Sequence, residues 1–91
     1  MEDRGKRDEV VREYEAQGYE VLATVHSQVQ AQRILIELAS AGGYQVIGYH
    51  ENSMVCRREV DGKLEELSII KRGRVQYYIV KREKQKEGAV S

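Results

Sequence analysis

The sequence predicts a small α+β domain, in which a mostly antiparallel sheet carries one main helix packed on one face. Two observations predict this class. Apolar residues first alternate between helical and strand periodicity, and then follow strand periodicity alone, with glycine-containing turns between the runs. The chain has 91 residues, which is enough for one modest core. The expected order is α-β-α-β-β-β-β, with a β-α-β unit that leads into a three-stranded meander.

The first helix is expected from Asp8 to Gln17. Val10, Val11 and Tyr14 recur there at helical spacing, whereas the preceding residues are charged and lack that periodicity. Gly18 then stands where a helix commonly ends in a left-handed glycine.

A strand is expected next, from residue 19 to 25. Its alternation places four apolar side chains on one predicted face: Tyr19, Val21, Ala23 and Val25. Ser27 and Gln30 then form a capping-box pattern just before an apolar stripe with helical spacing, and Gly42-Gly43 ends that stripe. The main helix is therefore predicted between these two signals.

The remaining strands follow from turn chemistry. Asp61-Gly62 is a strong signal for a two-residue hairpin loop, and Arg72-Gly73 is a weaker one. The first loop predicts that Arg58 faces Glu65 across the hairpin and that Arg57 faces Glu66. The predicted strands cover residues 44–50, 54–60, 63–71 and 74–82. Residues 1–82 thus form one domain, and residues 83–91 are expected to be a flexible charged tail.

The meander is predicted to be apolar on both faces, which one helix cannot cover. With a two-residue loop at Arg72-Gly73, one face carries Met54, Cys56, Leu67, Ile69, Tyr78 and Val80. The other carries Val55, Leu64, Ile70, Val75, Tyr77 and Ile79. Either the short first helix shields part of the latter face, or a second copy of the chain covers it. We expect the second copy, making a homodimer through Val55, Ile70, Tyr77 and Ile79.

Composition excludes several broad classes. Fifteen basic residues balance 15 acidic ones, so the chain as a whole has no net charge that would attract a polyanion. Cys56 is the single cysteine, and no apolar run is long enough to span a membrane. These features predict a cytoplasmic protein with no membrane partner. The high charged fraction is also typical of thermophilic proteins.

Candidate chemistry is sparse. His26 and His50 end the two repeated Gly-Tyr strands, and with Glu51 they are weak candidates for a metal or acid-base cluster if those strands are neighbours. The alternative is that all three are polar strand ends at the surface. Cys56 is expected to be a small buried side chain. No glycine-rich phosphate loop is present, so no cofactor is predicted.

Basic residues gather on the C-terminal strands and turns, with Tyr77 and Tyr78 among them. Lys71, Arg72, Arg74 and Lys81 are therefore the candidate contacts to a nucleic acid. The alternative is a solvated charged face, which also protects strand edges from aggregation.

Residues 35–83 resemble a family of small uncharacterised domains. The resemblance depends on the stretches "LIELASAGGYQVIGY" and "YYIVKRE". In these places the family has a helix ending in Gly-Trp-Glu, a strand, and a closing Lys-Arg strand. Tyr44-Gln45 departs from that pattern. The resemblance implies a fold and no activity.

Residues 7–21, "RDEVVREYEAQGYEV", are similar to the opening of archaeal Holliday-junction resolvases. That resemblance implies a metal-dependent nuclease, but the later carboxylate motif is missing: Ile69-Ile70-Lys71 has isoleucine where a metal ligand is needed. The leading prediction is consequently a non-enzymatic binding or regulatory module that acts through protein-protein contacts as a homo-oligomer. A nuclease-like enzyme using His50, Glu51 and Asp61 is the alternative.

Overall fold

The computed structural model describes residues 2–50 and 53–85, and its elements follow the predicted order. Their bounds are α1 Glu2–Ala16, β1 Tyr19–Val25, α2 Gln28–Gly42, β2 Gln45–His50, β3 Ser53–Val60, β4 Lys63–Arg72 and β5 Gln76–Gln85. The α+β class is confirmed.

One five-stranded sheet has the order β1-β5-β4-β3-β2, and every neighbouring pair is antiparallel. Strands β2 to β5 form a continuous meander, and β1 returns to pair with β5. As a result β1 and β2 point the same way but lie at opposite edges, with α2 as the connection across the sheet. In the described chain, β2 therefore pairs with β3 alone.

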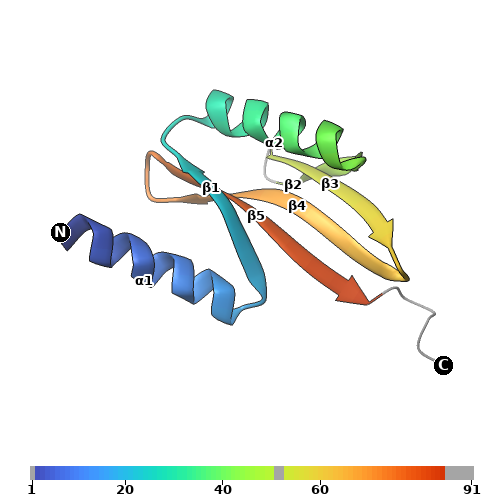
Figure 1. Cartoon of the computed structure of the whole chain (residues 1–91). Helices are drawn as coiled ribbons and strands as arrows, with labels where there is room; N and C mark the ends of the chain where they lie inside the picture. Colours follow the sequence, from blue (N-terminus) through green and yellow to red (C-terminus); the bar gives the residue numbers. More distant parts are fainter. Residues whose placement is uncertain (1, 51–52, 86–91) are drawn as a thin grey trace.

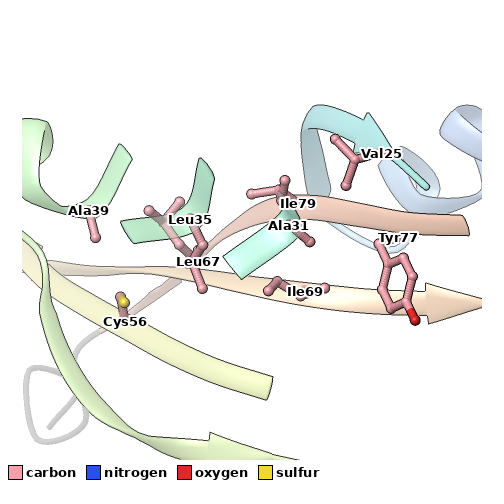
Figure 2. Packing of buried hydrophobic residues seen from close by; sticks show 9 residues of the cluster. All are labelled: Val25, Ala31, Leu35, Ala39, Cys56, Leu67, Ile69, Tyr77 and Ile79. Carbon is pink, nitrogen blue, oxygen red and sulfur yellow. The ribbon is translucent and has the colours of Figure 1, made fainter. Parts of the chain in front are cut away.

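Helix α2 covers one face of the sheet, as Figure 1 shows. Ser27 caps its start by accepting a hydrogen bond from the Gln30 backbone, and Gly43 ends it in a left-handed conformation. Leu35 is fully buried at the centre of this layer, where burial of one such side chain contributes about 1.5 to 3 kcal/mol. The core cluster drawn in Figure 2 comprises Val25, Ala31, Leu35, Ala39, Cys56, Leu67, Ile69, Tyr77 and Ile79.

Helix α1 lies on the opposite face, against β1 and β5 (Figure 1). Its anchor is Tyr14, whose ring meets Tyr78 edge-on at 5.3 Å and Tyr19 at 6.3 Å between centroids. The helix begins at Glu2, earlier than the predicted Asp8, because the charged residues before Asp8 are mostly good helix formers. The back of the sheet is thus covered from within over β1 and β5.

The prediction that all apolar side chains of β1 lie on one face is wrong. A bulge at Leu22 shifts the register between Val21 and Ala23. Val21 packs with the α1 cluster, whereas Ala23 packs with the α2 cluster. An inserted residue reverses the alternation, so one short strand supplies apolar side chains to both faces.

The predicted register of β5 is also wrong. Arg72 pairs with Gln76, so the loop holds three residues, 73–75, where two were expected. This odd shift exchanges the faces of β5: Tyr77 and Ile79 lie under α2, and the neighbouring positions Tyr78 and Val80 lie under α1. Strand β5 also extends through residues 83–85 of the predicted tail, which pair with the start of β4. Residues 86–91 lie outside the described part.

The Asp61-Gly62 hairpin is as predicted. Both residues adopt positive φ, 53° and 79°, as a type I′ turn requires. Arg58 faces Glu65 and Arg57 faces Glu66, and each pair forms an ion pair at 2.6 Å. A local turn therefore fixed the register of the β3-β4 pair.

Candidate interaction surface

The edge strand β2 exposes three large apolar side chains to solvent. The exposed fractions of Val46, Ile47 and Tyr49 are 54%, 48% and 68%. No charged residue lies between Gln45 and His50. Edge strands that avoid association usually carry lysine, proline or inward-pointing charge. The side of β2 away from β3 therefore combines an open backbone edge with apolar side chains.

A bulge sets the faces of β2. The register with β3 shifts at Ile47, so Val46 lies opposite Cys56 and Tyr49 lies opposite Met54. Cys56 and Met54 both belong to the α2 cluster, and therefore Val46 and Tyr49 share that face although they are three residues apart.

A polar cluster fixes the turn that delivers the chain from α2 into β2. Arg58 donates from Nε to the Glu65 carboxylate at 2.6 Å and from Nη1 to the Gly42 carbonyl oxygen, also at 2.6 Å. Its guanidinium also stacks 4.5 Å from the centre of the Tyr44 ring. A Cβ at Gly42 would come within 2.7 Å of that ring, so the close packing requires glycine. These contacts therefore fix the path of the chain from α2 into β2.

Electrostatics reinforce this cluster. The hydrogen bond from Arg58 lowers the pKa of Glu65, against the opposing effect of burial, and Lys81 at 3.5 Å adds to the lowering. Burial raises the pKa of the Tyr44 hydroxyl, which donates to Glu65 at 3.3 Å. Lys81, predicted to contact a nucleic acid, thus belongs to this scaffold.

The other predicted basic contacts lie at the opposite end of β5. Lys71 and Arg74 are exposed at the β4-β5 loop, and the Lys71 ammonium lies 6.0 Å from the centre of the Tyr77 ring. Arg72 instead pairs with Glu13 of α1 at 3.1 Å, and the hydrogen bond that Arg72 donates to that carboxylate raises the pKa of Arg72. The loop therefore presents two cations outward and uses the third to hold α1.

The residues predicted for an oligomer surface separate into two groups. Tyr77 and Ile79 lie in the core beneath α2, so their placement on that surface is wrong, for the register reason given above. Val55 and Ile70 remain on the back of the sheet, where both are half-buried. Ile70 packs at the margin of the α1 cluster.

The two histidines would lie close together only if β1 and β2 were neighbours, and these strands are not neighbours. His26 follows β1 and His50 ends β2, and these strands lie at opposite edges, about 19 Å apart at the usual strand spacing. The His50 side chain and Glu51 lie outside the described residues. Asp61 lies in the β3-β4 turn. Across the described side chains, no group of three His, Cys, Asp or Glu residues could hold a metal ion.

A cavity of about 590 Å³ opens where β3 separates from β4. Pairing of these strands begins at Cys56 and Leu67, although β4 continues to Arg72. Residues from both faces line the cavity, with Ser53 and Val55 on one side and Ser68–Lys71 on the other. Its volume lies within the range of small-ligand sites. The β2-β3 hairpin is thus attached to the sheet through the later part of β3.

The exposure of β2 follows from its position at the edge of the sheet, which was not predicted from the sequence. The absence of charge between residues 45 and 50 was a usable signal, but it is equally typical of a central strand.

In the described residues, no helix is long and apolar enough to cross a bilayer. No protein-family model matches the chain, and neither curated proteins nor solved structures show a significant similarity to it.

Proposed function

We propose that this chain is a non-enzymatic interaction module that acts as a homo-oligomer through its β2 edge. One observation carries the proposal: an edge strand with three exposed apolar side chains and no charge, held in place by the Arg58 cluster. Unpaired backbone groups beside apolar side chains favour the addition of another strand. The interaction surface predicted from the sequence thus moves from the sheet face to the sheet edge.

The back of the sheet supports this change. The apolar side chains of β5 on that side, Tyr78 and Val80, are already buried by α1. Over β3 and β4 the same face carries the Arg57–Glu66 ion pair, and Lys84 lies 3.5 Å from Glu66. Charged pairs are unfavourable in the core of a stable interface, because the loss of their hydration on association costs free energy.

Sedimentation equilibrium tests the proposal. We expect the average mass to rise from the chain mass of 10.5 kDa toward twice that value with concentration. Tyr49→Lys should weaken association at least tenfold, about 1.4 kcal/mol, by placing charge in the interface. Leu22→Lys is the matched control, because Leu22 is 37% exposed on the opposite edge strand. A 10.5 kDa mass throughout, or equal weakening by both variants, contradicts the proposal.

A second candidate function is nucleic-acid contact by the β4-β5 loop. Lys71 and Arg74 are both exposed at this end of the molecule. Lys71→Glu combined with Arg74→Glu should reduce a gel shift with single-stranded DNA, and wild-type binding should weaken steeply with salt. Arg12→Glu combined with Arg33→Glu is the control for net charge, since both residues are also exposed. An unchanged shift in the double variant rejects this candidate.

A further inference from the structure

The β2 strand is self-complementary in one antiparallel register. Val46 and Tyr49 share the α2 face, as their partners in β3 show. Gln45 and His50 lie opposite Arg57 and Ser53, so these two positions share the other face. From Gln45 to His50 the strand therefore has a polar residue, an apolar residue, the bulge at Ile47 and Gly48, an apolar residue and a polar residue. When the direction of the strand is reversed, each of these positions meets one that lies on the same face.

We infer that the partner of β2 is β2 of a second copy, paired antiparallel about a twofold axis perpendicular to the sheet. This inference rests on the proposed function and names its geometry. Val46 lies beside the partner's Tyr49, and Gln45 lies beside the partner's His50. The two sheets then join into one of ten strands, twice the five of a single chain, with both α2 helices on the same side.

This register is selected because opposite residues of two paired strands must lie on the same face of the sheet. Sliding one strand by a single residue places Gln45 beside the partner's Tyr49, and those two positions face opposite sides of the sheet. The proposed register pairs all six residues of β2, from Gln45 to His50. It also brings an aromatic ring beside a β-branched side chain, a favourable cross-strand pair.

A second copy fits the charge and the symmetry of the strand. Because β2 carries no charged residue, like copies approach without repulsion. Twofold pairing is closed, since it uses both β2 edges at once and leaves the β1 edges outward. The β1 edge carries Glu20, and a charged side chain on an edge strand discourages further strand addition.

Disulfide trapping distinguishes this geometry from association by another surface. Directly opposite residues have Cα atoms about 4.5 to 5.5 Å apart, within the range that a disulfide spans. Val46 and the partner's Val46 are three residues out of register, about 10 Å apart, which is beyond that range. Val46→Cys and Tyr49→Cys should therefore cross-link to each other and not to themselves.

The experiment mixes Val46→Cys with affinity-tagged Tyr49→Cys under mild oxidation, with each variant oxidised alone for comparison. Both positions are more than half exposed, so neither substitution removes a core side chain. Wild type is the control for Cys56, which is fully buried, and burial raises the pKa of its thiol. A mixed, tagged dimer on a non-reducing gel, at least tenfold more abundant than either self-linked species, is the expected result.

Two outcomes separate this inference from the proposed function. Wild-type dimers by sedimentation, without a mixed cross-link, leave self-association standing and overturn the β2 register. Strong self-linking of Val46→Cys alone overturns the register in the same way, because it requires a different pairing. Wild-type monomers at every concentration, with no cross-link, overturn both.

Discussion

Arg58 and Glu65 lie opposite each other on β3 and β4, and their side chains meet at 2.6 Å beneath the C-terminal end of α2. The same guanidinium donates to the Gly42 carbonyl oxygen, one of the groups that a helix end leaves without an internal partner. A single arginine thus joins the β3-β4 hairpin to the end of α2. This joint fixes where β2 begins, and with it the orientation of the proposed interface.

We expect Arg58→Lys to lower the melting temperature although the positive charge is retained. The lysine ammonium cannot reproduce the planar fork that reaches Glu65 and Gly42 together, nor its stacking on Tyr44. Thermal unfolding followed by circular dichroism measures the change. Arg33→Lys, an exposed replacement on α2, should leave the melting temperature unchanged, and equal melting of the two variants would assign Arg58 no structural role.

Acidification should destabilise the fold through Glu65 and Glu66. Hydrogen bonding from Arg58 lowers the pKa of Glu65. Burial raises the pKa of Glu66, but the hydrogen bond from Arg57 and the charges of Lys84 and Arg57 outweigh burial, so that this pKa is lowered too. A carboxyl group whose folded pKa lies below its usual 4.5 stabilises the fold above that pH, and loses this contribution as the pH falls through the folded pKa.

The melting temperature should therefore be nearly level from neutral pH to about pH 5, and should fall increasingly below it. A variant with Glu65→Gln and Glu66→Gln should melt lower at neutral pH and lose less on further acidification. Glu20→Gln, at an exposed position of β1, is the control. Parallel curves for the double variant and wild type would show that other groups cause the acid sensitivity.

Leu35→Ala should reduce the free energy of unfolding by about 2 to 5 kcal/mol, because it opens a cavity between α2 and the sheet. Leu35 is fully buried, whereas the adjacent Ile36 is 47% exposed. Ile36→Ala is therefore a matched control, expected to change stability by less than about 1 kcal/mol. Urea unfolding measures both. Similar losses at the two positions would mean that α2 does not bury the face described above.

Tyr14→Ala should release α1 from the sheet while leaving α2 in place. Tyr14 is buried and meets Tyr19 and Tyr78 edge-on, and loss of a buried aromatic ring costs about 3 to 5 kcal/mol. Hydrogen exchange should accelerate in residues 9–16 and remain slow around Leu35. Tyr14→Phe keeps the ring and should preserve protection of α1. Uniform acceleration through both helices would indicate that the two layers unfold as one unit.

Elements with local causes could be predicted from the sequence. Ser27 and Gly43 bound α2, and Asp61-Gly62 set the register that pairs Arg58 with Glu65. In each case the responsible backbone conformation is specified by residues within a few positions. The α+β class followed from these elements, because their order leaves few ways to build one core.

Features that depend on distant partners became visible only in the folded chain. A bulge at Leu22 exists because β1 must match β5 across 50 or more residues, and the three-residue β4-β5 loop was decided by packing of alternate β5 residues under two helices. Nothing local to residues 45–50 states how many strands separate them from β1. Three strands lie between, so β2 became an edge, and its apolar side chains became a surface.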